Sequence, residues 1–325
     1  MKLLFDDRWL GPHGIGRFAA EVAARCPMTP LGLGGKPLSL LDPARLTLAL
    51  SRARPGHFFS PGFNAPLGRP CPFSLTLHDL IHMDVPAESS AAKRFYYRHV
   101  ILPALGQAST VFTISEYSRQ RIAEWSGLEA SRIRVVGLGV GAGFTPEGPA
   151  RAHERPYLLY VGNHKPHKNV DGLLRAFAAS GLAPDLDLLL TGTLAPDLLD
   201  TARWLRISAR VHDLGLVPEG ELPALYRGAR ALVMPSFHEG FGLPVIEAMA
   251  CGTPVLSSNR TALPEAGGDA AAYFDPCEED SFIEGLRGLA DDTRLAELRA
   301  RGLRRAGRFE WNAVAGRVMQ GLQDQ

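Results

Sequence analysis

Two glutamates separated by seven residues are the most distinctive chemical feature of the sequence. In SFHEGFGLPVIE (236–247), Glu239 precedes a run rich in glycine, and Glu247 lies further along an apolar segment. Helices often carry acidic residues near their starts, where the macrodipole favours negative charge, so a purely structural explanation exists. The glycines, however, let the main chain approach a ligand. Because carboxylates accept hydrogen bonds from paired hydroxyls, Glu239 and Glu247 could bind a sugar and a ribose along one ligand.

The loop GNHKPHKN (162–169) is a second candidate site, because two lysines and two histidines crowd it directly before an expected helix. The first N–H groups of such a helix favour an anion, and basic side chains beside them strengthen that preference. A solvated group of charges is the competing explanation. Since the loop ends an apolar strand-like run, we favour a phosphate site there.

Two segments of the first half also follow expected strands. In GPHGIGR (11–17), Gly14 and Gly16 leave room for backbone to approach a phosphate, although the spacing is not that of a dinucleotide fingerprint. A tight turn explains the same residues equally well. In HDLIHMDVP (78–86), His78 could bind a substrate hydroxyl or take a proton, and a capped, half-buried histidine is the alternative.

Short apolar runs alternate with amphipathic helical segments along the whole chain, which indicates parallel sheets covered on both faces. The fold class is therefore α/β, with two doubly wound domains in series, and ligands are expected beyond the carboxyl ends of the strands. A stretch rich in Gly, Pro, Ala and Arg (140–156) is typical of a linker between them. The expected strands include 57–60, 73–79, 110–115, 132–139, 157–162, 185–192, 231–236 and 253–258.

Composition excludes several classes of function. The chain has 325 residues, and its 35 basic and 34 acidic side chains give a formal charge of +1, so no global field favours nucleic acid. Its four cysteines have no spacing suited to zinc, and free thiols in a reducing cytoplasm are expected. No segment is apolar for long enough to span a bilayer. The segment 94–105 mixes basic and apolar residues, which leaves peripheral contact with the inner face of the plasma membrane open, but a buried helix is favoured.

The segment 237–276 resembles the retaining glycosyltransferases of family 4, which have the GT-B fold of two Rossmann-like domains facing a central cleft. The residues that carry the resemblance are the two glutamates, together with HDLIHMDVP (78–86), TVFTISEYSRQRI (110–122) and YVGNHKPHKN (160–169). The resemblance implies an acceptor-side domain over 1–145 and a nucleotide-sugar domain over 146–308. A final helix at about 309–325 would pack back on the first domain.

The resemblance also implies roles for individual residues. Glu239 would contact the donor sugar, Glu247 the ribose, and Lys168 the diphosphate, while His78 would lie beside the reacting sugar. Many relatives carry arginine where this chain has Asn163, so His164 or Lys165 would supply the second cation. Further ligand contacts are expected from Gly14 and Gly16 on the diphosphate, from Gly240, Phe241, Gly242 and Leu243 near the sugar, and from Gly215 to Val217 on the nucleobase.

The expected activity is a metal-independent, retaining transfer of mannose, rhamnose or a related hexose, with no cofactor. The donor would be a nucleotide-diphosphate sugar, GDP-linked by similarity to bacterial surface-polysaccharide enzymes, and the acceptor a glycan or a lipid-linked saccharide. Two alternatives stay open. A nucleotide-sugar epimerase shares the fold and needs no acceptor, and a non-catalytic sugar-nucleotide binding protein is the interpretation that Asn163 favours.

Overall fold

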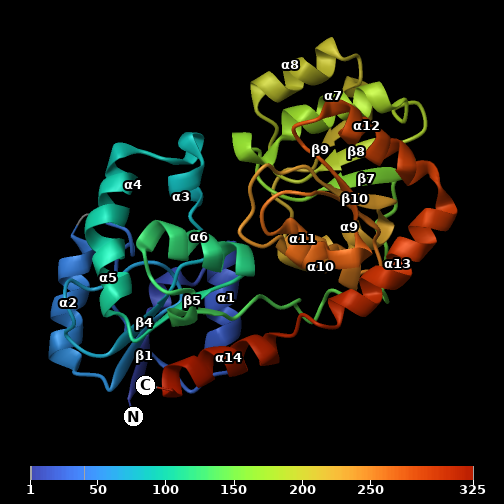
Figure 1. The fold of residues 1–325 in the computed structure, drawn as a ribbon. Helices are drawn as coiled ribbons and strands as arrows, with labels where there is room; N and C mark the ends of the chain where they lie inside the picture. Colours follow the sequence, from blue (N-terminus) through green and yellow to red (C-terminus); the bar gives the residue numbers. More distant parts are fainter. Residues whose placement is uncertain (1, 40, 325) are drawn as a thin grey trace. The chain divides into compact units, whose positions relative to one another are not determined.

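The structure is a computed structural model that describes residues 2–39 and 41–324. It divides into two compact units, the first made of Met1–Gly139 and Glu310–Gln325 and the second of Val140–Phe309. Each unit contains a six-stranded sheet whose strand pairs are all parallel, with helices on both faces (Figure 1). The α/β class and the doubly wound architecture expected from the alternating pattern are therefore confirmed.

The sheet of the first unit has the strand order β2-β1-β3-β4-β5-β6. One face carries α2, α5 and part of α6, whose leucines and isoleucines pack on Phe58, Phe73 and Leu75. The final helix α14 contacts α1 and β5. The elements of this unit are β1 (Leu3–Phe5), α1 (Gly14–Ala23), β2 (Thr29–Pro30), α2 (Asp42–Ala53), β3 (His57–Ser60), β4 (Phe73–Thr76), α3 (Ile81–Asp84), α4 (Ala91–Tyr96), a π-helical turn (Tyr97–Ile101), α5 (Leu102–Gln107), β5 (Thr110–Thr113), α6 (Glu116–Ser126), β6 (Ile133–Val135) and α14 (Trp311–Gln323).

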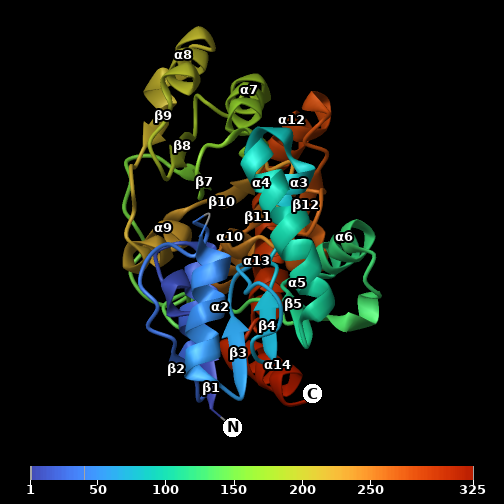
Figure 2. The same ribbon diagram turned by 90° about the vertical axis from the view of Figure 1, so that its left-hand side faces the viewer.

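The sheet of the second unit has the order β12-β11-β10-β7-β8-β9, so the chain order reverses between β7 and β10 (Figure 2). One face packs on α7, α8, α12 and α13 through a continuous apolar core. The elements are β7 (Tyr157–Tyr160), α7 (Val170–Ser180), β8 (Asp187–Leu190), α8 (Pro196–Trp204), β9 (Val211–Asp213), α9 (Leu222–Gly228), β10 (Ala231–Met234), α10 (Leu243–Ala250), β11 (Val255–Ser258), α11 (Leu263–Gly267), β12 (Ala272–Phe274), α12 (Glu279–Arg287) and α13 (Asp292–Ala306).

Several elements differ from the sequence expectations. Helix α2 (Asp42–Ala53) and the two-residue strand β2 lie before His57, outside the expected strands. The buried helix favoured over 94–105 is interrupted by the π-helical turn, a feature that recurs at functional sites. Among the described residues, none of the helices is both long and apolar enough to cross a membrane.

The packing of α14 on β5 generates a matched pair of predictions. A Cβ atom at Gly321 would lie 2.5 Å from Phe112 Cε1, whereas at Gly316 on the same helix it would meet nothing within 4 Å. Gly321→Ala is therefore expected to lower the free energy of unfolding by about 1 to 3 kcal/mol, because the core has no room for the methyl group. Gly316→Ala should raise it by about 0.5 to 1 kcal/mol, since alanine favours helix. Denaturant unfolding of both variants measures this, and equal shifts would contradict the close packing.

Candidate functional site

The strand order of the second unit creates a switch point at which the loops after β7 and β10 lie side by side. Ligands in doubly wound folds bind at such points, outside the carboxyl ends of the strands. Lys168 ends a short 3-10 turn after β7, and Glu239 lies in the loop after β10. Lys168 Nζ donates to both carboxylate oxygens of Glu239 at 2.8 Å. The two side chains are 15% and 11% exposed, so the ion pair is largely shielded from water.

Backbone and side-chain hydrogen bonds hold these two loops together. Asn169 Nδ2 donates to the Pro235 carbonyl at 3.2 Å, and the Phe237 amide donates to the His167 carbonyl at 2.8 Å. Asn169 itself has a left-handed backbone and no capping bond from its side chain. The Asn169 side chain therefore connects the loop after β7 to the loop after β10.

Glu239 is fixed by more than Lys168. The Ser236 hydroxyl donates to Glu239 Oε1 at 2.7 Å. The Glu239 amide donates at 3.0 Å to Thr261 Oγ1, in the loop after β11. Three neighbouring strands thus contribute to the orientation of one carboxylate, which is the property a binding group needs.

Two helices begin beside this ion pair without a side-chain cap among the described residues. Helix α7 follows Asn169, and α10 follows Gly242, whose φ of +109° suits glycine. A Cβ at Gly242 would also lie 2.8 Å from Leu263 Cδ2. Uncapped first turns present N–H groups and a partial positive charge to an anion. The arrangement suits the diphosphate that the sequence predicts for this loop.

The neighbours of Glu239 are mostly buried. Phe241 is 7% exposed and packs edge-on against Phe309 at 5.8 Å, so its side chain belongs to the interior. Gly240 and Gly242 are also buried, while Leu243 is half-buried at the start of α10. A ligand at this loop would therefore meet mainly backbone, and the contacts predicted for these four residues stay predictions.

Glu247 lies one turn inside α10 and is only 2% exposed. Its Oε2 accepts a hydrogen bond from the Tyr226 hydroxyl at 2.9 Å. A buried carboxylate with such a partner can reach only a ligand seated directly on the helix start. Its ribose contact stays a prediction, and Tyr226 is a positioning residue that the sequence did not indicate.

The turn after β7 places the His164 ring against backbone carbonyls. Its Nε2 faces the Thr191 carbonyl at 2.8 Å and its Nδ1 faces the Thr193 carbonyl at 3.1 Å. The ring is thus engaged by backbone in this structure, and the role of His164 in place of the missing arginine on a diphosphate stays a prediction. Asn163 and Lys165 are exposed, so their predicted roles are untouched.

Tyr160 stabilises the turn after β7 through a hydrogen bond. Its hydroxyl donates to the Asn163 carbonyl at 2.5 Å, and its ring is fully buried. Burial, and then the charge of Glu239, raise the pKa of Tyr160 well above its ordinary value. The hydroxyl therefore remains a donor at any physiological pH and keeps the turn closed.

The loop after β9, predicted to contact the nucleobase, is partly occupied by its own hydrogen bonds. The Gly215 amide donates to Asp213 Oδ1 at 2.8 Å, and the Gly215 carbonyl accepts from Gly192 at 2.7 Å. Gly215 therefore helps to position the loop, and its nucleobase contact stays a prediction. The nucleobase contact predicted for Val217 stays a prediction. The neighbouring Leu216 side chain is 95% exposed.

In the first unit, the glycine loop is also more structural than expected. The Gly16 amide donates to His13 Nδ1 at 2.9 Å, which caps α1. A Cβ at Gly16 would lie 2.1 Å from the Gly11 carbonyl oxygen, so glycine is required for close backbone packing. The Gly16 N–H is engaged by His13, whereas Gly14 is exposed, and the diphosphate contact expected near these two glycines stays a prediction.

His78 is buried after β4, with 7% of its surface exposed. Its Nε2 faces the Pro61 carbonyl at 2.9 Å, and its ring packs edge-on against Phe18. Burial lowers the pKa of His78, which makes the ring a weak base. Of the two predicted roles, proton acceptance is disfavoured, and contact with a sugar or acceptor hydroxyl stays a prediction.

Comparison with known families accounts for both units. Residues 144–306 match the family described as glycosyl transferases group 1, and residues 8–139 match the glycosyl transferase 4-like domain. The chain belongs to the group 1 glycosyl transferases. It is a glycosyltransferase, as the resemblance to family 4 implied.

Relatives and a solved structure agree with this assignment. The O-antigen chain mannosyltransferase B of Escherichia coli is 33% identical over 291 residues, which is 84% of this chain and 75% of that protein. The serotype-specific mannosyltransferase WbdA of the same species is 28% identical over 66% of this chain, which spans only 29% of WbdA. The structure of Anabaena Alr3699/HepE in complex with UDP and glucose superposes with a TM-score of 0.79 and 18% identity, covering all of both chains.

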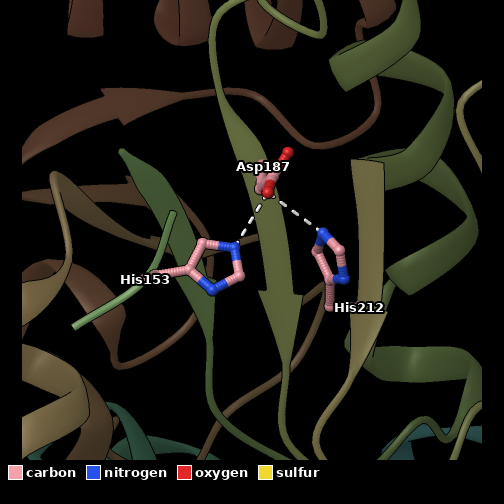
Figure 3. A group of neighbouring side chains, drawn as sticks. All are labelled: His153, Asp187 and His212. Atoms are coloured by element: carbon pink, nitrogen blue, oxygen red, sulfur yellow. Dashed lines mark hydrogen bonds and ion pairs between the residues drawn. The ribbon is translucent and has the colours of Figure 1, made fainter. Parts of the chain in front are cut away.

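The glycosyltransferase also contains a charged cluster at the start of β8, away from the strand-end loops. His153 Nε2 and His212 Nε2 lie 2.8 and 3.1 Å from the same oxygen of Asp187 (Figure 3). The three side chains offer ligand atoms within 4.8 Å of one another, which is a spacing that a metal ion could use. Arg155 and Arg210, however, lie 3.6 and 3.5 Å from the other Asp187 oxygen. We interpret the cluster as an ion-pair network that holds the edge strands.

Asp187 should therefore contribute to stability in a pH-dependent way. Burial alone would raise the pKa of Asp187, but the hydrogen bond from His153 and the charge of His212 outweigh it and lower the pKa below its ordinary value. The contribution is present above the unfolded-state pKa of about 3.9 and is lost as pH falls through the folded-state pKa. At pH 7, Asp187→Asn should lower the free energy of unfolding by about 2 to 3 kcal/mol, less than for a fully buried pair because the partners are partly exposed.

Denaturant unfolding at pH 7 and pH 3 tests this, and the difference between wild type and variant should shrink at pH 3. Asp185→Asn, at an exposed position two residues earlier, is the control and should change stability little. A rise in melting temperature on adding Zn²⁺ would contradict the ion-pair interpretation.

Proposed function

We propose that this glycosyltransferase moves a mannosyl residue, or a related hexose such as rhamnose, from a GDP-linked sugar to a glycan or lipid-linked saccharide acceptor. The configuration at the anomeric carbon would be retained. The observation that carries the proposal is the Lys168–Glu239 pair at the switch point, between two helix starts that lack side-chain caps. The mannosyltransferase names of the two E. coli relatives support the choice of sugar.

Lys168 supplies positive charge where the leaving group would gain negative charge. An ammonium group carries three donors, and Glu239 accepts from Lys168 through both of its oxygens. Two of these donors bind Glu239, and the third can bind a phosphate oxygen. A preorganised donor of this kind lowers a barrier by roughly 3 to 4 kcal/mol. The N–H groups at the starts of α7 and α10 would add to the same effect.

Glu239 would orient the donor sugar. Its carboxylate is held by Lys168 and by Ser236, and it remains 11% exposed, so a sugar hydroxyl can donate to it. Both of its oxygens already accept hydrogen bonds from Lys168, which limits the strength of the carboxylate as a nucleophile. We therefore assign Glu239 to substrate orientation and not to a covalent intermediate.

The proposed reaction conserves configuration through events on one face of the sugar. The bond between the anomeric carbon and the phosphate oxygen breaks, and the electron pair stays on the diphosphate. The acceptor hydroxyl forms the new bond from the same face, and its proton passes to the departing phosphate oxygen. No residue is needed as a strong base, which fits the lowered pKa of His78.

The proposed location is the cytoplasm, with peripheral contact at the inner face of the plasma membrane. All four cysteines are free thiols, and Cys277 is exposed. Such thiols are typical of a reducing compartment.

Lys168→Ala should lower kcat/KM by roughly 100- to 1000-fold, because a positioned charge on the leaving group is lost. The melting temperature should fall as well, because Glu239 loses its partner in a largely shielded ion pair, so the kinetics are measured well below it. The control is Arg175→Ala, which removes an exposed ion pair with Asp171 on α7. Steady-state kinetics with thermal unfolding separates the two effects, and an unchanged rate for Lys168→Ala would remove this residue from the mechanism.

The reaction itself is tested by incubating the enzyme with GDP-mannose and a mannose-terminated oligosaccharide. We expect release of GDP that depends on the acceptor, and a product whose new linkage has the anomeric configuration of the donor by NMR. An inverted linkage would contradict retention. An isomerised sugar nucleotide formed without acceptor would instead identify an epimerase.

A further inference from the structure

Two cavities in the first unit share a wall. A groove of about 460 Å³ runs between the start of α2 and the helix formed by α4 and the π-helical turn. A smaller cavity of about 150 Å³ is lined by His78 and Asp79. Phe63, His82 and Tyr97 line both, so the groove lies directly beside the cavity of the histidine that the sequence assigns to the reacting sugar.

The groove is strongly apolar and open to solvent. Four of its lining side chains are large, hydrophobic and exposed: Leu38 at 44%, Leu41 at 69%, Leu67 at 50% and Phe95 at 59%. Single exposed leucines are ordinary, but several around one concave surface mark a binding site. A saccharide alone would gain little from such a surface.

A buried ion-pair network holds one side of the groove, the start of α2. Arg8 donates to both oxygens of Asp6, at 2.7 and 2.6 Å, and is also ion-paired with Asp42, the first residue of α2. Asn64 Nδ2 donates to Asp6 at 2.7 Å, which joins the loop after β3 to the same network. Asp6, Asp42 and Asn64 are fully buried. The start of α2 is therefore fixed, and the groove exists before any ligand binds.

A cation lies where the two cavities meet. Lys93 lines the groove, its Nζ donates to the Glu88 carbonyl at 2.7 Å, and it lies 3.2 Å from His82 Nδ1. The Lys93 side chain is half-buried, so its charge is poorly screened by water. A phosphate between an apolar chain and a sugar would place its charge at this position.

We propose that the groove binds the hydrocarbon chain of a lipid-linked acceptor, with the linking phosphate at Lys93 and the sugar in the cavity beside His78. The inference rests on the proposed function, because it assigns an acceptor to a glycosyltransferase. A bilayer contact is the competing occupant, but the surface is concave and borders the cavity lined by His78, so it suits a single chain joined to a sugar. The enzyme itself, and not only the membrane, would then recognise the lipid.

The test compares one saccharide in two forms, free and linked through phosphate to a ten-carbon isoprenoid, without membranes and below the concentration at which the lipid aggregates. Each methylene withdrawn from water favours binding by about fourfold, before the cost of ordering the chain. We expect the lipid-linked form to have a KM at least about tenfold lower, with a similar kcat.

Leu41→Glu and Phe95→Glu should bring the KM of the lipid-linked saccharide closer to that of the free saccharide, because each places a charged side chain in the apolar groove. Leu48→Glu is the control, since Leu48 lies on α2, is 51% exposed and does not line the groove. All three sites are exposed, so the variants should fold, and their melting temperatures check this. Lys93→Gln should weaken the phosphate-linked acceptor but not an alkyl glycoside that bears the same chain without phosphate.

Equal KM values for the free and lipid-linked saccharides would overturn the inference. A preference that appears only after phospholipid vesicles are added would overturn it as well, and would identify the groove as a membrane contact. An equal effect of Leu48→Glu and Leu41→Glu would also contradict it. Failure of the proposed function looks different, because no mannose would then pass to either acceptor, whereas failure of this inference alone leaves equal transfer to both.

Discussion

The arrangement of the candidate site depends on one ion pair at the point where the strand order reverses. Lys168 and Glu239 are 71 residues apart in sequence, yet they meet because β7 and β10 are neighbours in the sheet. Their loops are joined by one backbone hydrogen bond, from Phe237 to His167, and by one from the Asn169 side chain to Pro235. The apolar sheet thus fixes the geometry, and the pair sets the charge that a sugar diphosphate would encounter.

Much of this could be predicted from the sequence, because buried parallel strands have a strong apolar pattern and ligands bind at their carboxyl ends. Glu239, Lys168 and His78 were found by that rule. Which partner each polar side chain takes could not be predicted. His164 faces two threonine carbonyls and the Gly16 amide is capped by His13, since both choices depend on loops whose paths are set by tertiary packing.

The first unit was harder to predict for a related reason. Helix α2 carries its leucines at every second position (46, 48 and 50), which is not a helical period, and Asp42 at its start would be expected at the surface. It is instead buried, and burial raises the pKa of Asp42 despite its pairing with Arg8. The contact joins segments 34 residues apart in sequence, so local periodicity carries no signal for it. The groove beside α2 is consequently a property of the fold and not of any motif.

A buried ion-pair network of this kind adds little net stability, because desolvation of the charges offsets much of their attraction. Its effect is on specificity of structure. Arg8 can satisfy Asp6 and Asp42 together only when α2 begins at one place beside β1, and Asn64 adds the same requirement for the loop after β3. An apolar core would tolerate small shifts of α2. The charged network does not, and it therefore keeps a concave apolar surface open next to His78, where hydrophobic packing alone would tend to close it.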